Sequence, residues 1–119
     1  MGSLSNFSAP QLGSSVINSV ISESGISKDL IDEIIMGQVL TGGSGQNPAR
    51  QACMISELPE SVSALTINQV CGSGLRSVMI ACQSILSGQS EIVIAGGQES
   101  MSNAHHTICL LYTSPSPRD

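Results

Sequence analysis

Three short apolar runs alternate along this chain with segments whose apolar residues recur at helical spacing. The runs cover residues 33–40, 62–70 and 91–95, and each has the length of a strand. A nearly continuous apolar strand is typical of a parallel sheet that is buried on both faces. Because such strands alternate here with helices, the sequence predicts an α/β fold with a mostly parallel sheet and helices on both faces.

The segments between the runs carry recognisable helix signals. The first helix is expected to begin after Ser8, a good capping residue, and to end at Gly25. A short helical turn is expected at residues 28–32 and a second helix at residues 47–58. A third helix, residues 74–87, has the clearest apolar stripe, and we expect this stripe to face the core. The stripe consists of Leu75, Val78, Met79, Cys82, Ile85 and Leu86.

Cys71 is the most informative residue for function, because it directly follows the second apolar run and precedes the third helix. Gly72 and Gly74 follow it and leave room for a substrate to approach. The first turn of a helix offers unpaired N–H groups and a partial positive charge, and both stabilise a thiolate nucleophile. The sequence therefore favours covalent catalysis by the Cys71 sulfur. Inert packing is the alternative, since free cysteines are usually buried.

Two glycine-rich loops follow strand ends in this reading. In an open parallel sheet the active site lies at the carboxyl ends of the strands. Residues 70–71 and 95–96 are two such ends, and we expect them to meet at one site. The loop of residues 41–46 lacks the Lys-Ser/Thr ending of a P-loop, which favours a plain connection over a phosphate site.

Composition argues against several other classes of function. A net charge of −5 with only four Lys and Arg argues against nucleic acid or an anionic membrane surface as a partner. The four cysteines form no C-x-x-C pair and the two histidines are adjacent, so we expect no metal site. No apolar run approaches the ~20 residues that a membrane helix needs. No signal peptide is recognisable, so the thiols are expected in a reducing compartment.

Three motifs, in order along the chain, resemble the N-terminal part of the thiolase family. They are Gly45-Gln46-Asn47-Pro48-Ala49-Arg50-Gln51-Ala52, Asn68-Gln69-Val70-Cys71-Gly72-Ser73-Gly74-Leu75 and Ala95-Gly96-Gly97-Gln98-Glu99-Ser100-Met101-Ser102. Within the family, the resemblance is closest to the acetyl-CoA acetyltransferases. It implies a partial thiolase N-terminal domain over residues 9–108. Residues 1–8 are then a non-matching or disordered N-terminus, and residues 109–119 a disordered or non-native tail.

The resemblance implies acyl transfer between coenzyme A thioesters in lipid metabolism, with no cofactor besides these substrates. Cys71 matches the nucleophile that accepts an acetyl group as a thioester, and its backbone N–H matches a donor to the acetyl oxygen. A second acetyl-CoA then attacks to give acetoacetyl-CoA, and the reverse reaction is thiolysis. Gly72 and Met101 are weaker candidates for substrate contact, and Asn68 is expected to hold the turn.

Other parts of the family's catalytic machinery have no match in this chain. The family's activating histidine lies in a Gly-His-Pro motif and its second cysteine in a Cys-Gly-Gly-Gly motif, and neither motif occurs here. We therefore expect the chain alone to be inactive, with His105 and His106 as exposed loop residues. The family's first strand, central in its sheet, has no match either. We accordingly expect residues 34–40 to keep an unpaired edge and the chain to be marginally stable or aggregation-prone.

Two alternatives stay open for the function. The chain can be part of a longer-chain 3-ketoacyl-CoA thiolase, or it can be a non-catalytic truncated product. The expected partner is an acyl-CoA, and the parent protein is expected to be a homodimer or homotetramer. The expected location is the cytoplasm, or the mitochondrial matrix if a transit peptide has been lost.

Overall fold

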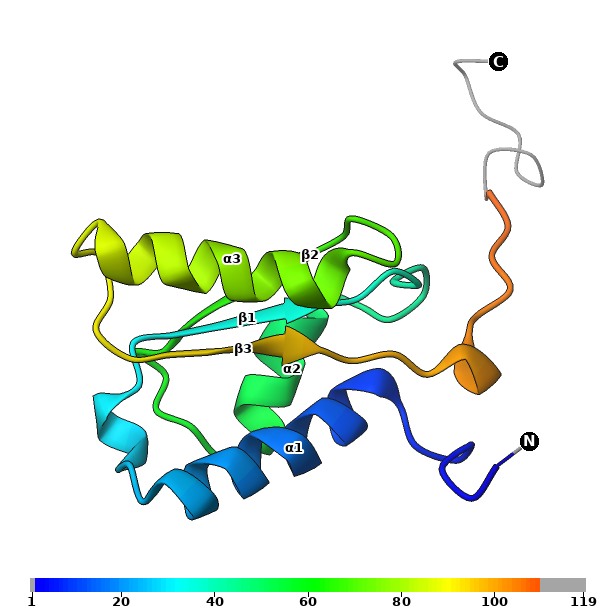
Figure 1. Cartoon of the computed structure of the whole chain (residues 1–119). Helices are drawn as coiled ribbons and strands as arrows, with labels where there is room; N and C mark the ends of the chain where they lie inside the picture. The colour runs from blue at the N-terminus through cyan, green and yellow to red at the C-terminus, as the bar shows by residue number, and fades with distance from the viewer. Residues whose placement is uncertain (1, 110–119) are drawn as a thin grey trace, which may run out of the picture.

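The computed structural model describes residues 2–109. Its elements are α1 (Ala9–Ser24), the 3-10 turn η1 (Lys28–Leu30), β1 (Glu33–Gly37), α2 (Pro48–Ile55), β2 (Ser63–Ile67), α3 (Ser73–Leu86), β3 (Val93–Gly97) and the 3-10 turn η2 (Met101–Asn103). Figure 1 shows α3 on one face of the sheet and α1 and α2 on the other. The predicted α/β fold with helices on both faces is therefore confirmed. From residue 110 onward, the expected tail lies outside the described residues.

Among residues 2–109, the sheet has three parallel strands in the order β2-β1-β3. β1 pairs along its whole length, from Glu33 to Gly37, with β2 on one side and β3 on the other. All five of its residues are buried. The prediction that residues 34–40 would keep an unpaired edge is therefore wrong. β1 itself occupies the centre of the described sheet, because the two crossovers return β2 and β3 to opposite sides of it.

Local signals in the sequence explain where α1 begins and ends. The Ser8 hydroxyl accepts a hydrogen bond from the Gln11 N–H, and the Gln11 side chain accepts one from the Ser8 N–H. This reciprocal pair is a capping box, which satisfies two N–H groups that the helix itself leaves unpaired. At the other end, Gly25 closes the helix in the left-handed region at φ 68°.

The apolar core lies between the sheet and the layer formed by α1 and α2 (Figure 1). It is aliphatic, which agrees with a chain that has a single Phe, a single Tyr and no Trp. Its buried members are Ile17, Ile21, Ile31, Ile34, Met36, Ala49, Ala52, Cys53, Leu58 and Val62. None of the helices within residues 2–109 is long and apolar enough to cross a membrane.

α3 packs against the sheet with a different face from the one predicted. Its buried residues are Ser73, Ser77, Ala81 and Ser84. The apolar stripe is largely exposed instead, with Leu75 70 % and Leu86 81 % accessible, and Cys82, expected in the core, is exposed as well. This face of α3 carries only small side chains, and it can pack on the sheet because glycines end β1 and β3. Without a Cβ at these positions, the helix can approach the backbone of the sheet closely. Hydrophobic periodicity cannot detect a contact made by serine and glycine.

Candidate functional site

Cys71 lies in the turn between β2 and α3, directly before the N-cap residue Gly72. Its thiol is exposed. In Figure 1 the first turn of α3 lies at the edge of the sheet toward which the arrowheads of β1 and β3 point. The sulfur therefore lies outside the core and beside the amino end of a helix. Its role as a nucleophile stays a prediction.

Cys53 gives a useful contrast within the same chain. It is fully enclosed in the apolar core. Burial raises the pKa of the Cys53 thiol, because the charged form loses its water, and the nearby Arg50 guanidinium offsets this only in part. The reading of a cysteine as inert packing therefore applies to Cys53.

A compact set of hydrogen bonds shapes the turn around Cys71. The Gln69 N–H donates to the Ser73 hydroxyl at 2.8 Å, and that hydroxyl donates to the Val70 carbonyl at 2.6 Å. Val70 has a φ of 51°, in the left-handed region that a β-branched residue rarely adopts. Strain of this kind persists only where the surroundings hold it, and it often occurs at functional sites.

Asn68 ties the turn to the loop that follows β1. Its Oδ1 accepts from the Val70 N–H at 2.9 Å, and its Nδ2 donates to the Val39 carbonyl at 3.3 Å. Within the turn, these contacts agree with the expectation that Asn68 holds the backbone near Cys71.

Glycines bring the first turn of α3 directly onto the sheet. A Cβ added to Gly37 would lie 2.6 Å from the carbonyl carbon of Ser73, and one added to Gly97 would lie 3.6 Å from the Cα of Gly74. The Ser77 hydroxyl also donates to the Gly96 carbonyl at 2.7 Å. The end of β3 and the turn after β2 therefore meet at the start of α3, as expected. Gly37 was not predicted as part of the site, because its only signal in the sequence is a glycine inside an apolar run.

The two weaker candidates for substrate contact, Gly72 and Met101, lie in different segments of the structure. Gly72 caps α3 and belongs to the Cys71 turn. Met101 is 76 % exposed at the start of η2. The side chain of Asn103 in the same 3-10 turn donates to the carbonyls of Ser5 and Phe7. Met101 therefore belongs to the segment that holds the amino-terminal residues.

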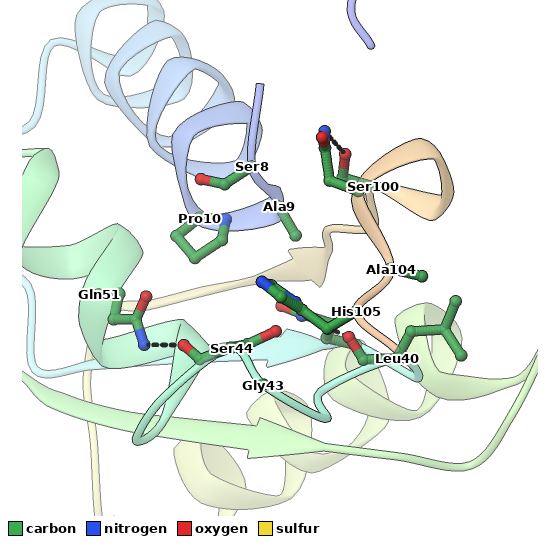
Figure 2. Close-up of a pocket in the computed structure, with 12 residues that line it drawn as sticks. Ser8, Ala9, Pro10, Leu40, Gly43, Ser44, Gln51, Ser100, Ala104 and His105 are labelled. Atoms are coloured by element: carbon green, nitrogen blue, oxygen red, sulfur yellow. Dashed lines mark hydrogen bonds between the residues drawn. The ribbon is translucent and has the colours of Figure 1, made fainter. Parts of the chain in front are cut away.

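A cavity at the same edge of the sheet lies between the start of α1, the loop after β1 and the segment after β3 (Figure 2). Its volume is about 160 Å³, which is below the ~300–1,000 Å³ of ordinary ligand pockets. Pro10, Ser44 and His105 are among its lining residues, and Cys71 is not. His105 packs over Gly43, and both His105 and His106 are exposed, as expected. Within residues 2–109, no three His, Cys, Asp or Glu side chains gather as a metal ion requires.

A family model described as Thiolase, N-terminal domain, matches residues 1–111. The chain belongs to the thiolase family. The resemblance predicted from the three motifs is thereby confirmed, and thiolases are acyltransferases.

Individual thiolases agree with this result. The chain is 54 % identical over 107 residues to the acetyl-CoA acetyltransferase of Cupriavidus necator, covering 90 % of this chain and 27 % of that protein. It is 50 % identical over 103 residues to a probable acetyl-CoA acyltransferase of Staphylococcus aureus, covering 87 % of this chain and 26 % of that protein. A crystal structure of an Ascaris suum thiolase with coenzyme A superposes with a TM-score of 0.87 at 41 % identity, covering 91 % of this chain and 28 % of that one. The chain thus spans about a quarter of the length of the curated relatives it matches.

Proposed function

We propose that Cys71 is the acyl-accepting nucleophile of an acetyl-CoA acetyltransferase and that this chain supplies the N-terminal part of that enzyme. The observation that carries the proposal is an exposed thiol at the β2–α3 turn. The name of the Cupriavidus necator relative, at 54 % identity, supports acetyl-CoA as the substrate. The coenzyme A bound to the Ascaris suum thiolase supports the same substrate class.

In the proposed first step, the Cys71 thiolate attacks the carbonyl carbon of acetyl-CoA. A carbon–sulfur bond to Cys71 forms, the bond to the coenzyme A sulfur breaks, and coenzyme A leaves as a thiolate that takes up a proton. The Cys71 N–H is the proposed donor to the developing oxyanion, and the amino end of α3 favours the negative charge. In the second step a base takes a proton from the methyl group of a second acetyl-CoA. The resulting enolate carbon attacks the thioester, the bond to the Cys71 sulfur breaks, and acetoacetyl-CoA forms while Cys71 leaves as a thiolate.

The first step is tested by incubating the chain with acetyl-CoA and analysing its peptides by mass spectrometry. We expect an acetyl group on Cys71, and we expect the Cys71→Ala variant to lose it. Cys82 is the internal control for unspecific acetylation, since it is also exposed but lies farther along α3. Equal acetylation of Cys71 and Cys82 would contradict the proposal.

We expect the 119-residue chain by itself to form no acetoacetyl-CoA. It contains neither the Gly-His-Pro nor the Cys-Gly-Gly-Gly motif. Chromatography of a mixture with acetyl-CoA tests this, and turnover beyond a single acetylation would show that the chain needs neither motif.

A second candidate is a thiolase that acts on longer 3-ketoacyl chains. The name of the Staphylococcus aureus relative, an acyltransferase, favours it. Competing acetyl-CoA against a longer acyl-CoA for Cys71 separates the two candidates. Preferred acetylation supports the first, and preferred transfer of the longer acyl group supports the second.

A further inference from the structure

Glu99, in the loop after β3, forms hydrogen bonds with the backbone of the loop that follows β1. Its carboxylate accepts from the Val39 N–H at 2.8 Å and from the Leu40 N–H at 3.3 Å. Hydrogen bonds to an ionised carboxylate are about twice as strong as neutral ones. Glu99 therefore holds a segment that lies 60 residues away along the chain.

The neighbouring Gln98 secures the same segment from inside the fold. Its side chain is buried, and its Nε2 donates to the Gln38 Oε1 at 2.9 Å and to the Pro48 carbonyl at 3.2 Å. Gln38 in turn donates to the Leu40 carbonyl at 3.1 Å. In residues 38–40, the N–H groups of Val39 and Leu40 are thus bound by Glu99, and the Leu40 carbonyl is bound by Gln38, which Gln98 holds in turn. These contacts fix the backbone of this segment.

Val39 connects this support to the Cys71 turn. Its N–H is held by Glu99, and its carbonyl accepts from Asn68 Nδ2 at 3.3 Å. Asn68 Oδ1 accepts from the N–H of Val70, the strained residue directly before Cys71. A continuous series of hydrogen bonds therefore runs from Glu99 to the backbone beside Cys71.

We infer that Glu99 is a positioning residue for Cys71. It fixes Val39, Val39 orients Asn68, and Asn68 holds the turn that keeps the sulfur at the amino end of α3. The inference rests on the proposed role of Cys71 as the nucleophile. Glu99 lies in the loop after β3, whereas Cys71 lies in the turn after β2, so Glu99 would act on the sulfur only through the series of hydrogen bonds.

The test measures the rate at which iodoacetamide alkylates Cys71, divided by the rate for Cys82 in the same chain. Both rates come from peptide mass spectrometry at short reaction times. Glu99→Ala and Asn68→Ala are each expected to lower this ratio about 2- to 10-fold, the effect of one lost hydrogen bond. Because both act in one series, the double variant is expected to lower the ratio no further than the larger single effect. Independent effects would multiply.

Conservative variants separate positioning from a merely structural role. Glu99→Gln keeps an acceptor for the Val39 N–H, and it is expected to recover most of the ratio. Asn68→Asp keeps the acceptor for Val70 but loses the donor to Val39, so in this background Glu99→Ala is expected to have no effect on the ratio. If Glu99 only ties the two loops together, Glu99→Gln would not restore the ratio. Glu99→Ala would then also have the same effect on the ratio in the Asn68→Asp background as in the wild type.

The buried Cys53 reports unfolding, since it is alkylated only when the core opens. If Glu99→Ala exposes Cys53, the Glu99→Gln and Asn68→Asp variants decide the question. An unchanged ratio in Glu99→Ala with Cys53 still protected would overturn the inference alone, as would multiplying effects in the double variant. A wild-type chain with no preference for Cys71 over Cys82 would instead overturn the proposed function and the inference with it.

Discussion

Val70 carries the strained backbone that precedes the candidate nucleophile. Its φ is 51° and its side chain is 64 % exposed, so side-chain packing does little to offset the strain. The hydrogen bonds that its N–H donates to Asn68 and that its carbonyl accepts from Ser73 hold it in place. Residues of L configuration lose about 1–2 kcal/mol in this region, whereas asparagine tolerates it.

We predict that Val70→Asn raises the free energy of unfolding by about 1 kcal/mol, because it relieves this strain. Urea denaturation measures the change. Val70→Ala is the control, since it shortens the side chain but keeps the Cβ that causes the strain, and it should gain less. A stability equal to that of Val70→Ala would contradict the explanation.

Asp32 gives a pH-dependent contribution to stability. Its carboxylate accepts from the N–H groups of Ile92 and Glu91, and these bonds lower the pKa of Asp32, Ile92 having the larger effect. Because the pKa is lower in the folded state, the contribution is present above the unfolded value of about 3.9 and is lost as the pH falls through the folded value.

We therefore predict that Asp32→Asn loses less stability than the wild type when the pH falls below about 4. Thermal unfolding followed across this range measures the difference. Asp29→Asn is the charge-matched control, because it removes the same charge three positions earlier and leaves both backbone contacts of Asp32 in place. Parallel pH profiles for Asp32→Asn and the wild type would show that the two backbone contacts do not stabilise the fold.

At the scale of elements, α3 matters most because it carries the Cys71 turn at its amino end and packs on glycines. The Ser73 backbone lies against Gly37 of β1, and Ser84 donates to the buried Glu33 carboxylate at the other end of the helix. These contacts set the height of the helix above the sheet. They therefore also set where Cys71 lies relative to the strand ends.

We predict that Gly37→Ala destabilises the fold by about 1–3 kcal/mol, the usual cost of overpacking. The added Cβ would lie 2.6 Å from the Ser73 carbonyl carbon, where only backbone can move. Gly96→Ala is the matched control in β3, because nothing lies within 4 Å of its added Cβ. Urea denaturation of both variants tests the contact, and equal midpoints would argue against close packing at Gly37.

At the scale of the whole molecule, the exposed face of α3 dominates the surface chemistry. Val78, Met79 and Ile85 are about half exposed, and Leu75 and Leu86 are more exposed still. Large apolar patches on soluble proteins promote association. The tendency to aggregate stays a prediction. It now rests on this exposed face of α3, because both edges of β1 are paired and the cause expected from the sequence is wrong.

We predict that Leu86→Lys reduces self-association, which sedimentation velocity at several concentrations measures. The side chain is 81 % exposed, so the change removes little packing. Gln83→Lys adds the same charge at an exposed polar position of the same helix. If Gln83→Lys reduces association equally, net charge and not the apolar face controls it.

Sequence reasoning succeeded where the signals are local. The capping box at Ser8, the closing Gly25 and the apolar run of β1 each depend on neighbouring residues, and the structure has each element where it was expected. Helix and strand bounds differ by a few residues, as for α2, which ends at Ile55 and not near Leu58. The three motifs were enough to predict the family that the comparison confirms.

The sequence by itself determined the order of helices and strands, the family, and the place of Cys71 between a strand and a helix, because periodicity, capping and short motifs are properties of adjacent residues. Only the tertiary structure decided that β1 is central, that α3 buries serine and alanine, and that the Glu99 carboxylate accepts from the Val39 N–H. Each of these depends on contacts between segments far apart in the chain. Small or charged residues make several of those contacts, and hydrophobic patterns do not record them.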